Sequence, residues 1–550
     1  MTLVFEALGK ALPQLEVPLM FGLPGSGNYE LVHAARAAGV SYCGANHEAG
    51  AVGMADGWAR VSRRTGVAML SQGPGLTNAL TALTEAVKSR TPLVVIVIDT
   101  PRTSLHGNLN IDQRAVVTVL GAGVDIVRSP QTAVSDLVRA FRRTSVERRP
   151  VVLMLPLDLI RAEVPDSADR VVELMTPSPP WPGSDVIGRV SSLIAAAHRP
   201  VIVAGRGAIA ADAKEVLVAL GDRIGAMLTA SAPAKGFFAG EAFDLGISGS
   251  FASPLAAELL VESDLVLAFG ASLNAWTTGN GKMICDAVAV VQVDSDSSAL
   301  GVHRGVIEAI HADARTTAIA LLSELNRRSR GSEGYRNPSI SKRISEYDRS
   351  EEFTPDPRAE RVDPRVVTLA LDEMLPVERT VTIDSGHFMG WPAKYLGVPD
   401  AAGFVYPQSF QCVGLGLAAS IGASLARPDR ISVIAIGDGG MMLSTQELDT
   451  AVRHRLPLLV AIYNDCAYGA EVHRFAPMGL DVDLVQFPER DFASVARASG
   501  AEAITVRTMA ELDGLRKWIA DPQGPMVIDI RIDPTVRGDW VAGNSKAALT

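Results

Sequence analysis

The chain has 550 residues, of which 47% are hydrophobic and 20% charged, a composition typical of a globular protein with several domains. It carries 51 Lys and Arg against 61 Asp and Glu, a net charge of −10 without a basic cluster, so we expect no nucleic-acid partner. The amphipathic N-terminus is not a signal sequence and no apolar run is long enough to span a bilayer, so we expect no membrane partner and predict a cytoplasmic protein.

Short apolar runs alternate with longer amphipathic segments along the whole chain. Apolar runs between helices indicate parallel strands buried on both faces, here at 17–23, 66–72, 92–100 and 150–158. Stretches rich in Pro, Ser and Gly near 165–186, and strongly polar at about 327–361, indicate linkers. We predict an α/β protein with three doubly wound parallel-sheet domains, at 1–165, 186–326 and 365–540.

The first third contains YCGANHEAGAVGMADGWAR (42–60), which predicts a helix from about residue 46 to 61. Glu48 falls in its first turn among mostly apolar neighbours. The helix dipole alone favours an acidic residue at that position. A buried carboxylate beside a heterocyclic ligand would instead serve as a proton partner.

The middle third opens with Gly205-Arg206-Gly207 after a strand-like run. This is a degraded dinucleotide fingerprint, and such a pattern by itself is a weak signal. We interpret it as a tight strand-to-helix turn.

The last third contains ISVIAIGDGGMMLSTQELDTAVRHRLPLLVAIYNDCAYGAE (431–471), which predicts a strand, a Gly-Asp-Gly-Gly turn, a helix at about 443–455 and a second strand. In a right-handed β–α–β unit both strands end at the same sheet edge, so we expect Asp438 and Asp465 to converge there. Two carboxylates suit Mg²⁺. Glycines around Asp438 allow the backbone to approach a diphosphate.

This segment resembles the thiamine-diphosphate motif, in which Gly-Asp-Gly is followed one strand later by Asn-Asn; residues 42–60 resemble the same family's H-E-x-x-A-x-x-M-A-x-G-x-A-R signature. The family includes the acetolactate synthase, benzaldehyde lyase and benzoylformate decarboxylase groups. The resemblance implies thiamine diphosphate and Mg²⁺ as cofactors, with Asp438, Asp465 and the Ala467 carbonyl as metal ligands. Asp465 departs from the family's Asn and adds a negative charge. Glu48 is implied to bond N1′ of the aminopyrimidine and so to activate the cofactor.

Further matches imply where the cofactor binds. Residues 21–31 and 71–83 resemble the Gly-rich loops of a pyrimidine-binding domain, and 384–391 and 410–426 the start of a diphosphate-binding domain. Val413 matches the residue that props the cofactor into its bent form, although a core valine would also account for it. The residues assigned to cofactor binding are Gly25, Gly73, Asn78, Gly386, His387, Val413, Gly437, Asp438, Gly439, Gly440, Met441, Ala467, Tyr468 and Gly469.

Four residues are assigned to catalysis, namely Glu48, Glu471, Asn28 and Asn108. Asn28 and Asn108 fall in loops that face the reactive carbon in relatives. Glu471 falls where pyruvate and indolepyruvate decarboxylases carry an acid, although a solvated glutamate on a helix would also account for it. Asn108-Leu109-Asn110 replaces the Phe-Gln-Glu of acetolactate synthases, which argues against strict acetolactate synthase activity. Ser272 and Trp276 replace the flavin-binding Arg pattern, so we do not expect FAD.

The resemblance implies cleavage or formation of a C–C bond on a 2-oxo acid by an acetolactate-synthase-like carboligase or decarboxylase. One alternative is a benzaldehyde-lyase-like enzyme acting on a 2-hydroxy ketone, and another is a non-catalytic nucleotide-binding regulator on the same scaffold. Relatives bind the cofactor between the first domain of one subunit and the third domain of another. A homodimer or homotetramer with its active site at the subunit interface is therefore implied.

Overall fold

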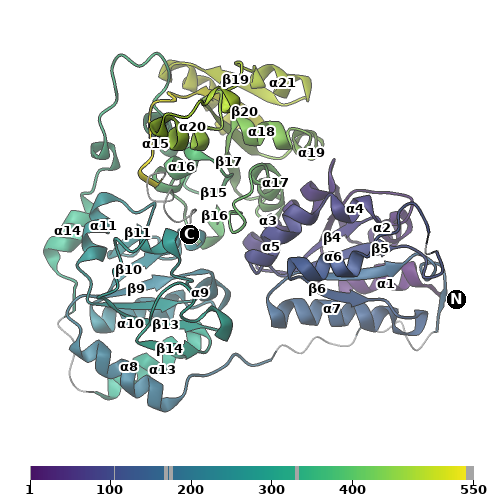
Figure 1. The fold of residues 1–550 in the computed structure, drawn as a ribbon, viewed down its shortest axis with the longest axis horizontal. Coiled ribbons are helices and arrows are strands. Elements are labelled where there is room, and N and C mark those ends of the chain that lie inside the picture. Colours follow the sequence, from purple (N-terminus) through teal and green to yellow (C-terminus); the bar gives the residue numbers. More distant parts are fainter. Residues whose placement is uncertain (1, 105, 166–170, 172–176, 329–333, 541–550) are drawn as a thin grey trace.

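The chain folds into three α/β domains, each built on its own six-stranded parallel sheet (Figure 1). The computed structural model describes residues 2–104, 106–165, 171, 177–328 and 334–540. The strand orders are β3-β2-β4-β5-β7-β6, β11-β10-β9-β12-β13-β14 and β16-β15-β17-β18-β20-β19. A small antiparallel pair, β1-β8, joins the two ends of the first domain. The predicted fold class of three parallel-sheet domains is confirmed.

The N-terminal domain has strands that are almost wholly buried, as in β5, where helices cover both faces of the sheet. Its amphipathic first helix places Leu8 and Leu12 in the core. Its elements are β1 (Thr2–Leu3), α1 (Val4–Gln14), β2 (Leu19–Gly22), α2 (Tyr29–Ala37), β3 (Ser41–Gly44), α3 (Glu48–Ser62), β4 (Gly66–Leu70), α4 (Pro74–Thr77), α5 (Leu80–Lys88), β5 (Leu93–Asp99), α6 (Gln113–Leu120), β6 (Gly123–Ile126), α7 (Ala133–Glu147), β7 (Val151–Pro156) and β8 (Glu163–Val164).

The middle domain repeats this design with a separate core on each face of its sheet. Asp313 caps its last helix by accepting hydrogen bonds from two backbone N–H groups of the first turn. Its elements are α8 (Ser184–Ala196), β9 (Pro200–Ala204), α9 (Arg206–Ala210), α10 (Lys214–Ile224), β10 (Met227–Ala230), β11 (Asp244–Ile247), α11 (Pro254–Val261), β12 (Leu265–Phe269), α12 (Ala275–Thr278), β13 (Ala289–Asp294), β14 (Glu308–His311) and α13 (Ala314–Arg327).

The C-terminal domain carries the third sheet at the top of Figure 1. Its elements are α15 (Pro364–Met374), β15 (Arg379–Ile383), α16 (Gly390–Tyr395), β16 (Phe404–Val405), α17 (Gly416–Ala426), β17 (Ile431–Gly437), α18 (Asp438–Ser444), α19 (Glu447–Arg453), β18 (Leu458–Asn464), α20 (Gly469–Phe475), α21 (Phe492–Ala498), β19 (Glu502–Val506), α22 (Leu515–Ala520) and β20 (Met526–Arg531). The helix expected at about 443–455 is in fact two helices, and the first begins directly at Asp438.

The polar stretch expected as a linker at about 327–361 is partly folded; its residues 329–333 lie outside the described part. It contains α14 (Pro338–Ser345), capped by Asn337, whose side chain accepts the Ile340 N–H. The buried side chains of Tyr335 and Ile340 pack into the middle domain, which explains why this polar segment is ordered. In the first expected linker, residues 166–170 and 172–176 also lie outside the described part.

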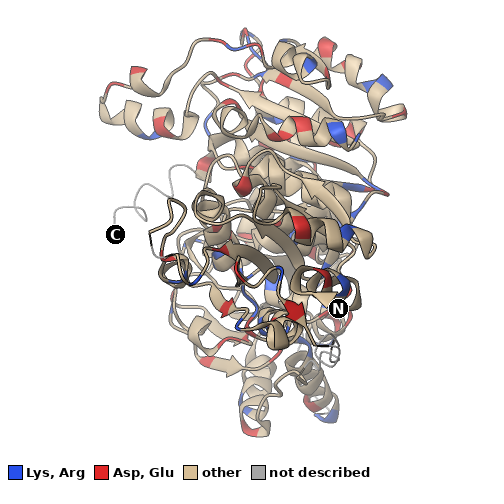
Figure 2. Ribbon diagram, turned by 90° about the vertical axis from the view of Figure 1, so that its right-hand side faces the viewer, with Lys and Arg blue, Asp and Glu red and all other residues tan. Residues whose placement is uncertain are grey.

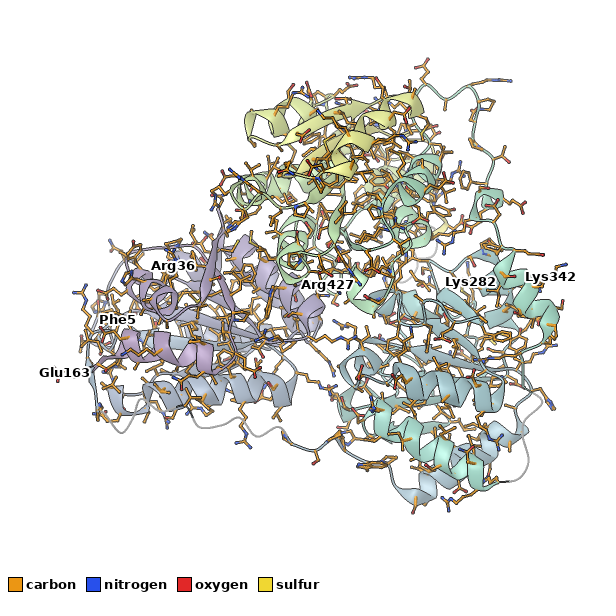
Figure 3. All side chains as sticks on the ribbon, turned by 180° about the vertical axis from the view of Figure 1, so that it is seen from behind. Phe5, Arg36, Glu163, Lys282, Lys342 and Arg427 are labelled. Carbon is orange, nitrogen blue, oxygen red and sulfur yellow. The ribbon has the colours of Figure 1, made fainter. Side chains whose placement is uncertain are left out.

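The N-terminal and C-terminal domains meet through α3 and α17 at the centre of the molecule (Figure 1). Both helices are rich in small residues, which lets their backbones approach closely. Phe5 and Glu163 lie at one outer edge of the molecule and Lys342 at the opposite edge (Figure 3). Acidic and basic residues are interspersed along the ribbon (Figure 2). No helix in the described ranges has the length and apolarity needed to cross a bilayer.

Candidate functional site

Asp438 and Asp465 meet at one edge of the C-terminal sheet. Asp438 opens α18 directly after β17, and Asp465 follows the neighbouring parallel strand β18. Each carboxyl group shifts the pKa of the other, so the two groups lie close together. The convergence expected from the β–α–β geometry is therefore present. The pair lies at the carboxyl ends of the strands and beside the switch point between β15 and β17, where open α/β sheets bind ligands.

The electrostatics of this acid pair suit a divalent cation. Burial raises the pKa of Asp438 to about 6. Burial, together with repulsion from the Asp438 charge, raises the pKa of Asp465 to about 8. Two buried acids that oppose each other's ionisation would be relieved by a cation between them. Within the described ranges no cluster of three or more His, Cys, Asp or Glu is placed to hold a metal ion.

The backbone after β18 is held in a shape that leaves one carbonyl available. The buried Asn464 side chain donates to Asp529 and accepts the Cys466 N–H. A bridge then pairs residues 467 and 486 through bonds from Tyr468 N–H to the Val485 carbonyl and from Phe487 N–H to the Cys466 carbonyl. Neither bond uses the Ala467 carbonyl, so the donor set of two carboxylates and this carbonyl fits Mg²⁺.

Asp384, which sequence analysis did not single out, ties the Val413 loop to the sheet. It follows β15, is fully buried, and its carboxylate accepts the N–H groups of Gly414 and Gly416 at 2.9–3.1 Å. Burial raises its pKa to about 6. A Cβ on Gly440 would stand 2.2 Å from its Oδ2, so α18 packs directly on it. The signal available in the sequence was the Asp that opens the segment DSGHFMGW (384–391).

His387 lies at the switch point between β15 and β17 and is held by the segment that follows β20. Its Nε2 accepts the Gly538 N–H at 3.0 Å, and Trp540 Nε1 donates to its carbonyl at 2.9 Å. Its ring centroid is 4.1 Å from that of His473 on α20. Burial lowers the pKa of His387 to about 3, so the ring is neutral. Trp540 was not found from sequence because its partners are more than 140 residues away along the chain.

Glu48 is the first residue of α3, and its side chain is 8% exposed. Asn78 Nδ2 donates to Glu48 Oε2 at 3.0 Å, which joins two of the predicted site residues. The Gly73 N–H donates to Gln113 Oε1, so the turn before α4 is fixed by a buried amide. These residues lie near the switch point between β2 and β4 of the N-terminal sheet.

The other predicted residues differ in their surroundings. Asn28 is buried and its amide bonds its own loop, with Oδ1 accepting the Gly25 N–H and Nδ2 donating to the Leu23 carbonyl. Asn108 is exposed on the loop before α6. Met441 is buried in the core shared by the N-terminal and C-terminal domains. Tyr468 is 39% exposed and packs edge-on against Phe487.

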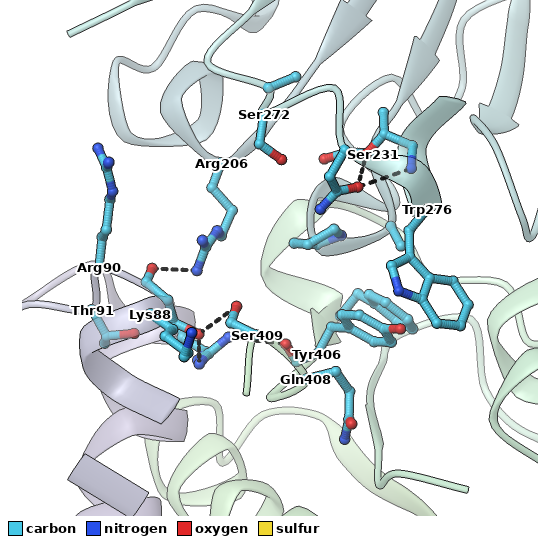
Figure 4. A pocket seen from close by; sticks show the side chains of 18 of the residues that line it. Lys88, Arg90, Thr91, Arg206, Ser231, Ser272, Trp276, Tyr406, Gln408 and Ser409 are labelled. Atoms are coloured by element: carbon cyan, nitrogen blue, oxygen red, sulfur yellow. Dashed lines mark hydrogen bonds between the residues drawn. The ribbon is translucent and has the colours of Figure 1, made fainter. Parts of the chain in front are cut away.

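A cavity of about 1140 Å³ lies where the three domains meet. Its wall includes Gly386, His387, Val413 and Glu471 of the C-terminal domain, but among its described lining residues are neither Glu48 nor Asn28. Aromatic rings gather around Phe251, with centroid distances of 5.5 Å to Trp276, 6.3 Å to Tyr406 and 5.8 Å to Trp540. In Figure 4, Trp276 of the middle domain lies above Tyr406 of the C-terminal domain.

The middle domain presents the end of β9 to this cavity. Gly205 and Gly207 lie where β9 leads into α9 and pack against the Gly270 backbone directly after β12, so this stretch is a tight strand-to-helix turn. Arg206 extends across the cavity to the Ser89 carbonyl of the N-terminal domain (Figure 4). Burial lowers the pKa of Arg206 to about 10, and the nearby Arg60 charge contributes.

Three segments match models of the thiamine pyrophosphate enzymes: 2–118 the N-terminal TPP binding domain, 187–321 the central domain and 384–530 the C-terminal TPP binding domain. The chain is 32% identical to a probable 2-ketoarginine decarboxylase of Pseudomonas aeruginosa, over 93% of this chain and 90% of the relative. It is 29% identical to a putative acetolactate synthase large subunit of Mycobacterium tuberculosis, over 94% and 96%. It is 28% identical to a sulfoacetaldehyde acetyltransferase of Castellaniella defragrans, over 94% and 90%.

Proposed function

Because the chain belongs to the thiamine-pyrophosphate-dependent enzymes that act on 2-oxo acids, we propose that it is a Mg²⁺-dependent 2-oxo-acid decarboxylase. The observation that carries this proposal is the position of Glu471 on the cavity wall that also contains Gly386 and Val413. A carboxyl group there is placed to hand a proton to the reacting carbon after CO₂ leaves. When bound, thiamine diphosphate would supply a nucleophilic thiazolium carbon and an electron sink for the bond that releases CO₂.

The metal and the diphosphate are assigned to the edge of the C-terminal sheet. Asp438, Asp465 and the Ala467 carbonyl hold Mg²⁺, supported by the buried acid pair and the carbonyl that the 467–486 bridge does not use. The diphosphate would be held by the turns at Gly386–His387 and Gly437–Met441 and by the segment Tyr468–Gly469. Val413 supports the cofactor from the loop that Asp384 anchors.

The pyrimidine end is assigned to the N-terminal domain. Glu48 holds a proton at N1′ of the aminopyrimidine, and the Asn78 amide orients its carboxylate. Gly25 and Gly73 lie on the neighbouring turns. Asn28 and Asn108 remain predictions as catalytic residues; the bonds of Asn28 within its own loop give it a structural role in addition.

A homodimer or homotetramer with the active site between subunits is part of this proposal. The cavity that contains Val413 and Glu471 does not include Glu48 of the same chain among its described lining residues. Large apolar side chains are exposed on α18 beside the acid pair, with Met442 at 49% and Leu443 at 55%. On the N-terminal domain Tyr29 is 63% exposed next to Asn28. Such surfaces are typical of a subunit interface.

A substrate panel tests the reaction. Protein loaded with thiamine diphosphate and Mg²⁺ is supplied with 2-ketoarginine, pyruvate and benzoylformate, and the CO₂ and organic products are measured. CO₂ with an aldehyde product supports the decarboxylase. CO₂ with a 2-hydroxy ketone would reassign it as a carboligase, and cleavage of 2-hydroxy ketones alone as a lyase. Cofactor binding without turnover of any class would indicate a regulator.

A further inference from the structure

Two buried glutamates, one on each side of the junction between the N-terminal and C-terminal domains, form hydrogen bonds with the opposite domain. Glu447 lies on α19 of the C-terminal domain and Glu85 on α5 of the N-terminal domain, and each is 1% exposed. Each carboxylate accepts backbone N–H groups from a loop of the other domain. Neither residue belongs to the cofactor or metal set described above.

Glu447 holds the turn that leads into α3. Its Oε1 accepts the His47 N–H at 3.0 Å and the Asn46 N–H at 3.2 Å, and Thr450 Oγ1 donates to its Oε2 at 2.9 Å. The residue directly after His47 is Glu48. The orientation of the first turn of α3 is therefore fixed by a carboxylate of the C-terminal domain.

Glu85 holds the loop that leads into α17. Its Oε2 accepts the Phe410 N–H at 2.6 Å, and its Oε1 accepts the Ser409 N–H at 3.1 Å and a bond from Arg60 at 3.0 Å. Arg60 also donates to the Tyr406 carbonyl. Val413 lies three residues beyond Phe410, and the far end of this loop is anchored by Asp384.

The two contacts are reciprocal. The helices α3 and α17 pack on each other, and the loop preceding each one is held by an acid of the opposite domain. Two N–H groups that point in different directions need either two acceptor oxygens or one oxygen that both can reach. A carboxylate has two acceptor oxygens, whereas a side-chain amide has only one. Backbone N–H donors fix loop position, which an ion pair between flexible side chains would not do.

We propose that Glu447 and Glu85 are positioning residues, Glu447 for Glu48 and Glu85 for the Val413 loop. This role rests on the proposed function, in which Glu48 and Val413 contact the two ends of thiamine diphosphate. The contacts at the domain junction thereby position residues on both the pyrimidine side and the thiazolium side of the cofactor sites.

We call the contact of Glu447 with residues 46–47 and that of Glu85 with residues 409–410 the two clamps. Hydrogen exchange of the cofactor-free protein tests the clamps without relying on activity. Glu447→Gln is expected to raise amide exchange in residues 44–50, and Glu85→Gln in residues 406–414. Asp136→Asn is the matched control, because Asp136 is a fully buried carboxylate that accepts a backbone N–H within its own domain. It should leave both segments unchanged. Unchanged exchange in a segment whose clamp has been removed would overturn that clamp.

Binding and turnover of the loaded enzyme separate the two roles. In Glu447→Gln we expect kcat to fall by at least about tenfold while the Kd for thiamine diphosphate stays within about twofold, since a misplaced Glu48 affects activation rather than anchoring. In Glu85→Gln we expect that Kd to rise about tenfold. Equal losses in the Asp136→Asn control would refute positioning. If the parent protein binds no thiamine diphosphate, the proposed function fails, whereas the exchange result still decides whether the clamps exist.

Discussion

Glu48 shows how much a single side chain contributes when its surroundings are fixed. Its carboxylate is nearly buried and bonded to Asn78, so an isosteric amide will fit the same space. We expect Glu48→Gln to keep the fold and the Kd for thiamine diphosphate but to lower kcat by about 10²-fold or more, the usual contribution of a positioned proton partner. Steady-state kinetics with a binding titration measure both quantities. Turnover close to that of the parent would remove Glu48 from the mechanism.

The acid pair predicts how stability depends on pH in the absence of metal. The pKa values of Asp438 and Asp465 are raised in the folded state to about 6 and about 8, above their unfolded value near 4. The folded protein therefore binds more protons, so the stability that the pair contributes is fully present below the unfolded pKa. It is lost as pH rises through the folded pKa values.

In the presence of a metal chelator, the unfolding temperature should therefore fall as pH rises from about 5 to about 8.5. Mg²⁺ should oppose this fall because it favours the ionised carboxylates. Asp465→Asn should flatten the profile of the metal-free protein, whereas Asp513→Asn, a substitution on the surface, should not. An identical slope in the parent and Asp465→Asn would contradict the assignment.

At the level of elements, the close contact between α3 and α17 depends on glycines, which leave room for the backbone of the facing helix. A Cβ on Gly422 would stand 1.9 Å from the Met54 carbonyl oxygen. Gly422→Ala should therefore destabilise the protein by about 2 kcal/mol or more, although alanine favours helix by about 1 kcal/mol. Gly188→Ala on α8 is the control, because no atom lies within 4 Å of its added Cβ. It should instead stabilise by about 0.5–1 kcal/mol. Urea denaturation of both variants gives the comparison.

Most elements were predictable because hydrophobic periodicity and chirality act locally. The strands at 66–72, 92–100 and 150–158 correspond to β4, β5 and β7, and the helix placed at about 46–61 corresponds to α3. The break between α18 and α19 was missed, since no Pro or Gly marks residues 445–446. Helix α14 was missed because its polar composition hides the few side chains, such as Ile340, that pack on the middle domain.

For the whole molecule, the exposed residues on α18 predict self-association. Leu443 and Val261 are 55% and 56% exposed, but only Leu443 lies beside the acid pair. We expect Leu443→Asp to shift the protein toward a species of 58.1 kDa and to weaken cofactor binding. Val261→Asp should keep a mass of at least twice that value. Sedimentation velocity distinguishes the two, and a monomeric parent would contradict the shared-site proposal.

The sequence by itself determined the three parallel sheets, the convergence of Asp438 and Asp465, and the family to which the chain belongs. These follow from periodicity, from the fixed hand of β–α–β crossovers, and from short motifs whose residues act within one domain. Only the tertiary structure decided that Glu471 faces a cavity shared by three domains and that Trp540 holds His387. It also decided that Glu447 and Glu85 accept backbone hydrogen bonds from the opposite domain. Those contacts join residues far apart along the chain, and their partners are mainly backbone groups, which leave no pattern in the sequence.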